Sequence, residues 1–96
     1  MLYALLCNDK PGQLQLRLDT RTAHLDYLNG LGDALKFAGP FLGDDAKPNG
    51  SLVVIEAADL DAAKTVAAGD PYARAGLFET VDIRPWNWAI KNPDSK

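Results

Sequence analysis

Residues 2–7 read Leu-Tyr-Ala-Leu-Leu-Cys, and residues 51–56 read Ser-Leu-Val-Val-Ile-Glu. Their aromatic and β-branched side chains, together with their short length, predict two strands. Successive side chains of a strand point to opposite faces of a sheet, and in both stretches apolar residues occupy both sets of positions. The fold must therefore bury both faces of the sheet that contains these two strands.

The other elements are predicted from periodicity and from turn residues. Leucines at helical spacing predict a helix over residues 13–32, and residues 35–42 are typical of a strand. We expect a bulge or a strand end at 39–40, because Gly-Pro does not fit within a regular ladder. A second helix is predicted over 59–69, with an aspartate as its N-cap, and a last strand over 77–86. The buried face of the second helix is expected to comprise Leu60, Ala63, Val66 and Ala67.

The order strand-helix-strand-strand-helix-strand is that of the ferredoxin-like α+β fold, with a four-stranded antiparallel sheet. Right-handed crossovers place both helices on one face of this sheet. The other face would then be a large exposed apolar patch, which soluble monomers rarely tolerate. We therefore predict a homodimer in which two copies pack sheet to sheet. Residues 1–96 are expected to form one domain, with a polar C-terminal tail over 87–96.

Composition limits the classes of function. The chain has 96 residues, of which 47% are hydrophobic and 24% charged, and this fits one globular domain. Its net charge of -3 argues against general nucleic-acid binding, because there is no basic surplus to neutralise phosphates. A small anionic ligand, held by a local arginine cluster, is compatible with this charge.

Location and cofactors are predicted from features that the sequence lacks. No apolar run approaches the ~18 residues of a membrane span, and the first residues lack the basic region and cleavage site of a signal peptide. Cys7 is the only cysteine, so no intrachain disulfide can form. We therefore expect a cytoplasmic protein that is not bound to a membrane. No cysteine or histidine cluster has metal-ligand spacing, and neither a metal nor another cofactor is expected.

His24 is the only histidine of the chain, and histidine is the side chain best suited to proton transfer near neutral pH. Arg17, Arg21 and His24 are separated by four and three residues, so they lie along one face of the predicted helix. This pattern fits a site that binds an anion and transfers a proton. It also fits two solvated arginines beside a half-buried histidine.

A histidine that transfers protons needs a group that orients its ring, commonly a carboxylate. Spacing along the chain does not choose among the five candidates, which are Asp26, Asp33, Asp44, Asp45 and Asp70. Asp70 precedes Pro71, and Asp-Pro is also a common start of a turn. Ser51 follows a glycine at a strand start, where its hydroxyl could donate to a developing oxyanion. Its surroundings do not resemble the nucleophile elbow of a serine hydrolase.

Several short motifs, in the order of the predicted elements, resemble the YciI-like (YCII-related) family. They are Arg17…Arg21…His24-Leu25 on the first helix, Ala38-Gly39-Pro40, Gly50-Ser51, and Asp70-Pro71-Tyr72 followed by Gly76-Leu77. The resemblance covers residues 1–85. The loop over 41–49 is shorter than is usual in the family, which weakens any analogy that depends on a lid.

The resemblance implies a ferredoxin-like fold that dimerises into an α+β barrel, with a His-Asp pair at a cavity. In this sequence the pair corresponds to His24 and Asp70. The residues implied to surround a small-molecule ligand are Arg17, Arg21, Gly39, Pro40, Ser51 and Tyr72. One of the two arginines would hold an anionic group of that ligand.

The resemblance also implies an enzyme that acts on a small anionic metabolite of aromatic or lactone type, by isomerisation, elimination or hydrolysis. A dehydrochlorinase of the family acts on a chlorinated hydroxyquinol, and muconolactone isomerases share the barrel more distantly. The alternative is a binding or sensing module, in which His24 and the arginines recognise a ligand without reacting. Trp86 and Trp88 can share one face of an extended strand, and we expect them to pack in the core or at the dimer contact.

Overall fold

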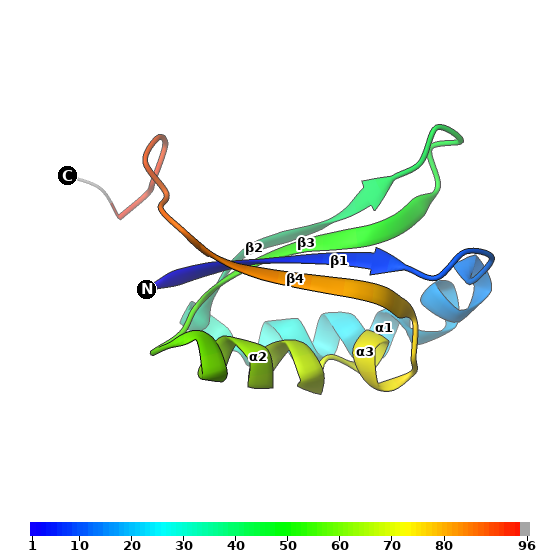
Figure 1. Cartoon of the computed structure of the whole chain (residues 1–96), viewed down its shortest axis with the longest axis horizontal. Helices are drawn as coiled ribbons and strands as arrows, with labels where there is room; N and C mark the ends of the chain where they lie inside the picture. Colours follow the sequence, from blue (N-terminus) through cyan, green and yellow to red (C-terminus); the bar gives the residue numbers. More distant parts are fainter. Residues whose placement is uncertain (95–96) are drawn as a thin grey trace.

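The structure is a computed structural model that describes residues 1–94; residues 95 and 96, the end of the predicted tail, lie outside the described part. Figure 1 shows one layer of strands with helices along one of its faces. The elements are β1 (Leu2–Asp9), α1 (Leu14–Gly30), a 3-10 turn (Gly32–Ala34), β2 (Leu35–Leu42), β3 (Pro48–Glu56), α2 (Leu60–Gly69), α3 (Pro71–Arg74) and β4 (Phe78–Trp86).

The four strands form one antiparallel sheet in the order β2-β3-β1-β4. The two central strands, β1 and β3, are those with apolar residues on both faces. The helices α1, α2 and α3 all lie on the same face of the sheet (Figure 1). The predicted ferredoxin-like α+β fold is confirmed. Within residues 1–94, no helix has both the length and the apolar character needed to cross a bilayer.

The hydrophobic core lies on the inner face of the sheet, which we define as the face toward the helices. Its buried residues are Tyr3, Leu5 and Cys7 from β1, Val53 and Ile55 from β3, Leu28 from α1 and Ala63 from α2. They alternate along each strand, as a half-covered strand requires. Ala63 is 0% exposed, and its small side chain lets α2 lie close to the sheet.

Within residues 1–94, no helix lies over the outer face of the sheet (Figure 1), yet Val54 is only 1% exposed and Ala4 only 8%. Phe37, Trp86 and Trp88 form an aromatic cluster beside these residues, with ring centroids 5.0 to 5.8 Å apart. Phe37 pairs in register with Val54, and the chain after β4 rises on the outer side of the sheet (Figure 1). Part of the outer face is therefore covered from within the chain.

Two local predictions were wrong. Residues 39–40 pair in regular register with β3, and the irregularities of β2 fall on either side of them. β2 is an edge strand, and a proline is tolerated in an edge strand because the open side of the strand forms no ladder hydrogen bonds. Leu60 is 39% exposed, because it is the first residue of α2 and does not reach the core. β3 also begins at Pro48, a few residues before its predicted start.

Candidate active site

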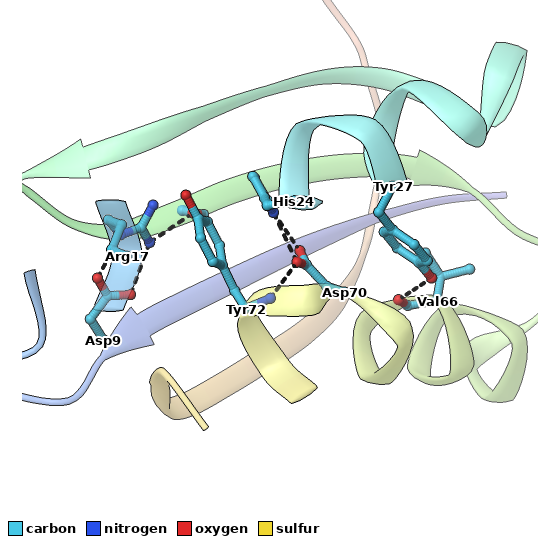
Figure 2. Close-up of polar contacts among 8 residues, drawn as sticks. Asp9, Arg17, His24, Tyr27, Val66, Asp70 and Tyr72 are labelled. Atoms are coloured by element: carbon cyan, nitrogen blue, oxygen red, sulfur yellow. Dashed lines mark hydrogen bonds and ion pairs between the residues drawn. The ribbon is translucent and has the colours of Figure 1, made fainter. Parts of the chain in front are cut away.

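His24 and Asp70 meet where α1 passes the junction between α2 and α3. Nδ1 of His24 lies 2.9 Å from each carboxylate oxygen of Asp70 (Figure 2). His24 is 7% exposed and Asp70 is 6% exposed. A carboxylate can only accept hydrogen bonds, so Nδ1–H donates to Asp70. Nε2 of a neutral His24 is then left with a free lone pair.

The local sequence explains why Asp70 lies at this junction. α2 ends at Gly69, and α3 begins at Pro71, whose fixed φ suits the first position of a helix. Asp70 is the N-cap of α3, and its Oδ1 accepts a hydrogen bond of 2.9 Å from the backbone N–H of Tyr72. The cap therefore holds the carboxylate in an orientation that also reaches His24.

A second contact ties α1 to α2 beside this pair. The hydroxyl of Tyr27 donates a hydrogen bond of 2.8 Å to the backbone oxygen of Val66 (Figure 2). A Cβ atom at Gly69 would lie 2.5 Å from the same hydroxyl. Glycine at this position therefore allows α1 to approach α2 closely, one residue before Asp70.

Tyr72 stands between His24 and Arg17 (Figure 2). The His24 ring stacks on one side of it, with ring centroids 3.9 Å apart and an angle of 16° between the planes. On the Tyr72 ring, the guanidinium carbon of Arg17 lies 4.5 Å from the centroid. The imidazole is thus held at its edge by Asp70 and on its face by Tyr72. Both contacts restrict rotation of the ring.

Arg17 is only 4% exposed, and its buried charge is compensated by an ion pair within the chain. Its Nε and Nη2 donate to the two carboxylate oxygens of Asp9, at 2.6 and 2.9 Å, which makes a bidentate ion pair. Nη2 also donates to Oγ of Ser51 at 3.0 Å. Asp9 ends β1 at a point where the register of the β1–β4 pairing shifts. Arg17 is therefore occupied by Asp9, which the sequence analysis did not identify.

A cavity of about 240 Å³ lies between α1 and the inner face of β2 and β3. Its polar lining residues are Arg17, Arg21, His24, Ser51 and Tyr72. Gly39 and Pro40 of β2 also line it, and the rest of the wall is apolar. Of the eight residues that the family resemblance implies at the site, only Asp70 does not line the cavity, because it contacts the Nδ1 edge of His24. No carboxylate is among the described lining residues.

Arg21 differs from Arg17 in its environment. It is exposed, it lines the same cavity, and it forms no ion pair with any residue in the described part of the chain. Among the described residues, the cavity wall therefore has one free cation and no anion. This local excess of positive charge occurs in a chain whose net charge is -3.

Burial governs the ionisation of the groups around the cavity. It raises the pKa of Tyr72, against the opposing effect of Arg17, so the phenol keeps its proton and can donate at neutral pH. Burial alone would lower the pKa of Arg17, but the hydrogen bonds and charge of Asp9 outweigh it and the pKa rises. Burial, assisted by the charge of Asp70, raises the pKa of Cys7 to about 12. The thiol is therefore unreactive near neutral pH.

The remaining acidic candidates lie elsewhere. Asp26, Asp33, Asp44 and Asp45 are exposed, and within residues 1–94 His24 is hydrogen-bonded to Asp70 alone among the aspartates. Asp44 and Asp45 line a larger hollow of about 770 Å³ between the loops around residues 10–13 and 43–49. That hollow is open and contains no histidine, so we do not assign the site to it. In the described residues, no three acidic, histidine or cysteine side chains are grouped to hold a metal.

The fold and this cavity define a class of protein: a small ferredoxin-like α+β domain with a buried histidine–aspartate contact beside a ligand-sized cavity. The family model described as the YCII-related domain matches residues 1–87, and the chain belongs to this family. The sequence-based resemblance is thereby confirmed.

Similar proteins agree with this assignment. Protein YciI of Escherichia coli is 38% identical over 94 residues, which cover 90% of this chain and 96% of that protein. The solved structure of 5-chloro-2-hydroxyhydroquinone dehydrochlorinase from Burkholderia phenoliruptrix, in complex with 2,5-dihydroxybenzoquinone, is similar with a TM-score of 0.84 and 36% identity, covering 91% of this chain and 94% of that chain. A dimeric ferredoxin-like protein of unknown function from Jannaschia has a TM-score of 0.51 and 19% identity, covering 88% and 98%, which supports the fold alone.

Proposed function

We propose that the protein is an enzyme in which His24 and Asp70 form a general acid–base pair. The observation that supports this most directly is the 2.9 Å contact between Nδ1 of His24 and the carboxylate of Asp70, on a ring that also lines a cavity. Asp70 fixes the tautomer of the imidazole, and Nε2 removes a proton from a substrate in the cavity. Nε2–H then returns the proton to another atom of the substrate.

The substrate is a small anionic compound of aromatic or lactone type. A cavity of about 240 Å³ is smaller than the sites of drug-sized ligands, and it suits a compound with one ring. Its free cation, Arg21, supplies the charge for an anionic group, and its apolar wall suits the ring. The similar dehydrochlorinase was solved with 2,5-dihydroxybenzoquinone, a one-ring compound that carries several oxygens.

The reaction class follows from proton transfer without a cofactor. A single acid–base group supports isomerisation by moving a proton on a bound carbonyl compound, elimination by removing a proton as a leaving group departs, and hydrolysis by taking a proton from an attacking water. Tyr72 and Ser51 face the same cavity as His24, and their hydroxyls donate to the oxygens of the substrate. Gly39 and Pro40 form the wall at β2 and limit the width available to the ring.

We also propose that the protein is a homodimer that associates through the outer face. Leu6 and Leu52 of the two central strands alternate with inner-face residues and are half-buried. The aromatic cluster covers only one part of this face. Phe37 pairs with Val54, and Trp86 is the last residue of β4. A second copy would cover the remaining apolar surface with the same residues, as a two-fold interface requires.

A comparison of the wild type with His24→Ala tests the catalytic proposal. Both proteins are incubated with a panel of lactones, hydroxyquinols and small carboxylic acids, and both turnover and binding are measured. We expect turnover of at least one compound by the wild type, and a loss of about 100-fold or more in His24→Ala with binding retained. Lys64→Ala, an exposed substitution on α2, is the matched control and keeps full turnover. Loss of affinity in His24→Ala, with no turnover by the wild type, would instead identify a binding or sensing module.

A further inference from the structure

We propose that the cavity selects its ligand by charge, and that Asp9 determines this selectivity. The deep part, at Arg17 and Ser51, takes a neutral carbonyl oxygen, and Arg21 at the mouth takes an anionic group. The inference rests on the proposed function in assuming that this cavity binds the substrate. It goes further because it assigns an orientation to the substrate and a role to Asp9, a residue that does not line the cavity.

The net charge at the deep part of the cavity is set by Arg17 and Asp9. Arg17 and Asp9 are joined by two hydrogen bonds, and their side chains are 4% and 5% exposed. At this separation the two opposite charges cancel for any group a few ångströms away, and only a dipole remains. The deep part therefore has no net charge to offer an anion. A carboxylate placed there would lose its hydration without a compensating cation.

A hydrogen-bond donor remains at the deep part of the cavity. Nε and Nη2 of Arg17 are used by Asp9 and Ser51, and the guanidinium also interacts with the side chain of Tyr72. Oγ of Ser51 accepts from Arg17, so the proton of the Ser51 hydroxyl is free to donate. Both residues line the cavity. The Ser51 hydroxyl, held in place by Arg17, suits one carbonyl oxygen, and it stabilises the negative charge that develops on that oxygen when a neighbouring proton is removed.

The mouth of the cavity contains Arg21. Arg21 is exposed and has no ion-pair partner within residues 1–94, so its charge is available to a ligand. His24 lies one helical turn beyond Arg21, on the same face of α1 as both arginines. His24 lines the same cavity and stacks on Tyr72, whose ring also contacts Arg17, so a ligand that fills the cavity from Arg17 to Arg21 lies beside the imidazole. The substrate class is a monoanionic carbonyl compound whose reactive C–H is next to the carbonyl group.

Two probes of matched shape test the inference. 4-Formylbenzoate carries one carbonyl and one carboxylate, whereas terephthalate carries two carboxylates. We expect the wild type to bind 4-formylbenzoate at least about tenfold more tightly than terephthalate, as measured by calorimetry. Arg21 can pair with one carboxylate of either probe, and the second carboxylate of terephthalate has no cation to pair with. Asp9→Asn gives the deep part a net positive charge and should reverse the preference. The double variant Asp9→Asn with Arg17→Gln removes both charges and should restore the preference of the wild type.

The controls separate this inference from the catalytic proposal. Arg21→Gln should weaken both probes by a similar factor, because both place a carboxylate at the mouth. His24→Ala should keep the ratio of affinities even though it abolishes turnover, so failure of one proposal does not resemble failure of the other. Equal affinities in the wild type, binding of neither probe, or an unchanged ratio in a folded Asp9→Asn variant would overturn the inference. If Asp9→Asn does not fold, the wild-type ratio and Arg21→Gln still decide it.

Discussion

The inner and outer faces of the sheet are built by the same two central strands, but they are buried in different ways. The inner face contains the buried polar groups: the Asp9–Arg17 ion pair and the contact between His24 and Asp70. The buried residues of the outer face are apolar, and they lie beside an aromatic cluster. The inner face is therefore sensitive to changes of charge, whereas the outer face is sensitive to changes of volume and to association. Four predictions test that difference.

The largest effect is expected on the inner face. Arg17→Gln leaves the Asp9 carboxylate buried without its cation, and we expect the free energy of unfolding to fall by ~3 kcal/mol or more. Arg21→Gln removes an exposed arginine from the same helix face and should change it by less than ~0.5 kcal/mol. Urea unfolding of both variants measures the difference. Equal midpoints for the two variants would show that burial of the ion pair has no energetic consequence.

The next effect is expected on the outer face. Leu52→Lys places a charge in the proposed contact between two copies, and we expect the dimer dissociation constant to rise by about 100-fold. Light scattering at micromolar concentration should then report half of the wild-type mass. Ala68→Lys, at an exposed position of α2, is the control and should leave the mass unchanged. A wild-type protein that is monomeric at this concentration would contradict the dimer.

A third prediction compares two glycines on the two strands of the β2–β3 hairpin. A Cβ atom at Gly50 would lie 2.5 Å from the backbone oxygen of Cys7, so β1 and β3 would have to separate. We expect Gly50→Ala to cost ~1–3 kcal/mol in unfolding free energy. Nothing lies within 4 Å of a Cβ atom at Gly39, and Gly39→Ala should cost far less. Thermal unfolding of the two variants would contradict this if their midpoints coincide.

The smallest effect concerns Cys7 on the inner face. Its pKa is raised from 9.0 to about 12, so between these values the unfolded chain has lost the thiol proton while the folded chain keeps it. The folded state then binds more protons, and its stability falls as pH rises, by at most ~1.4 kcal/mol per unit. Cys7→Ala should lose less stability than the wild type between about pH 8 and pH 10, measured by urea unfolding. Equal losses in both proteins would contradict the assignment to Cys7.

Much of the fold could be predicted because local patterns and the global topology agree. The apolar runs of β1 and β3 and the leucine spacing of α1 fixed the element order, and that order has one common topology. His24 and Asp70 were chosen through the family resemblance. Spacing alone left five carboxylates open, because 46 positions separate the two residues and only the packing of α1 on α2 and α3 joins them.

The ion pair of Arg17 could not be predicted from spacing. Asp9 and Arg17 are eight positions apart and lie on different elements, and a turn separates them. The direction of the Asp9 side chain depends on the irregular pairing at the end of β1. From the sequence, the two arginines are therefore equivalent. Packing makes one of them a buried, paired cation and leaves the other free.

Asp70 has two roles that bear on how this family diverges. It caps α3 through the N–H of Tyr72, and it also orients His24. A descendant that abandoned the chemistry would still be selected to keep an aspartate there, because the helix needs its cap. An aspartate at this position in a related chain therefore says little about activity. His24 caps no helix in the described structure, so its replacement in a descendant would be the clearer mark that the proposed reaction has been lost.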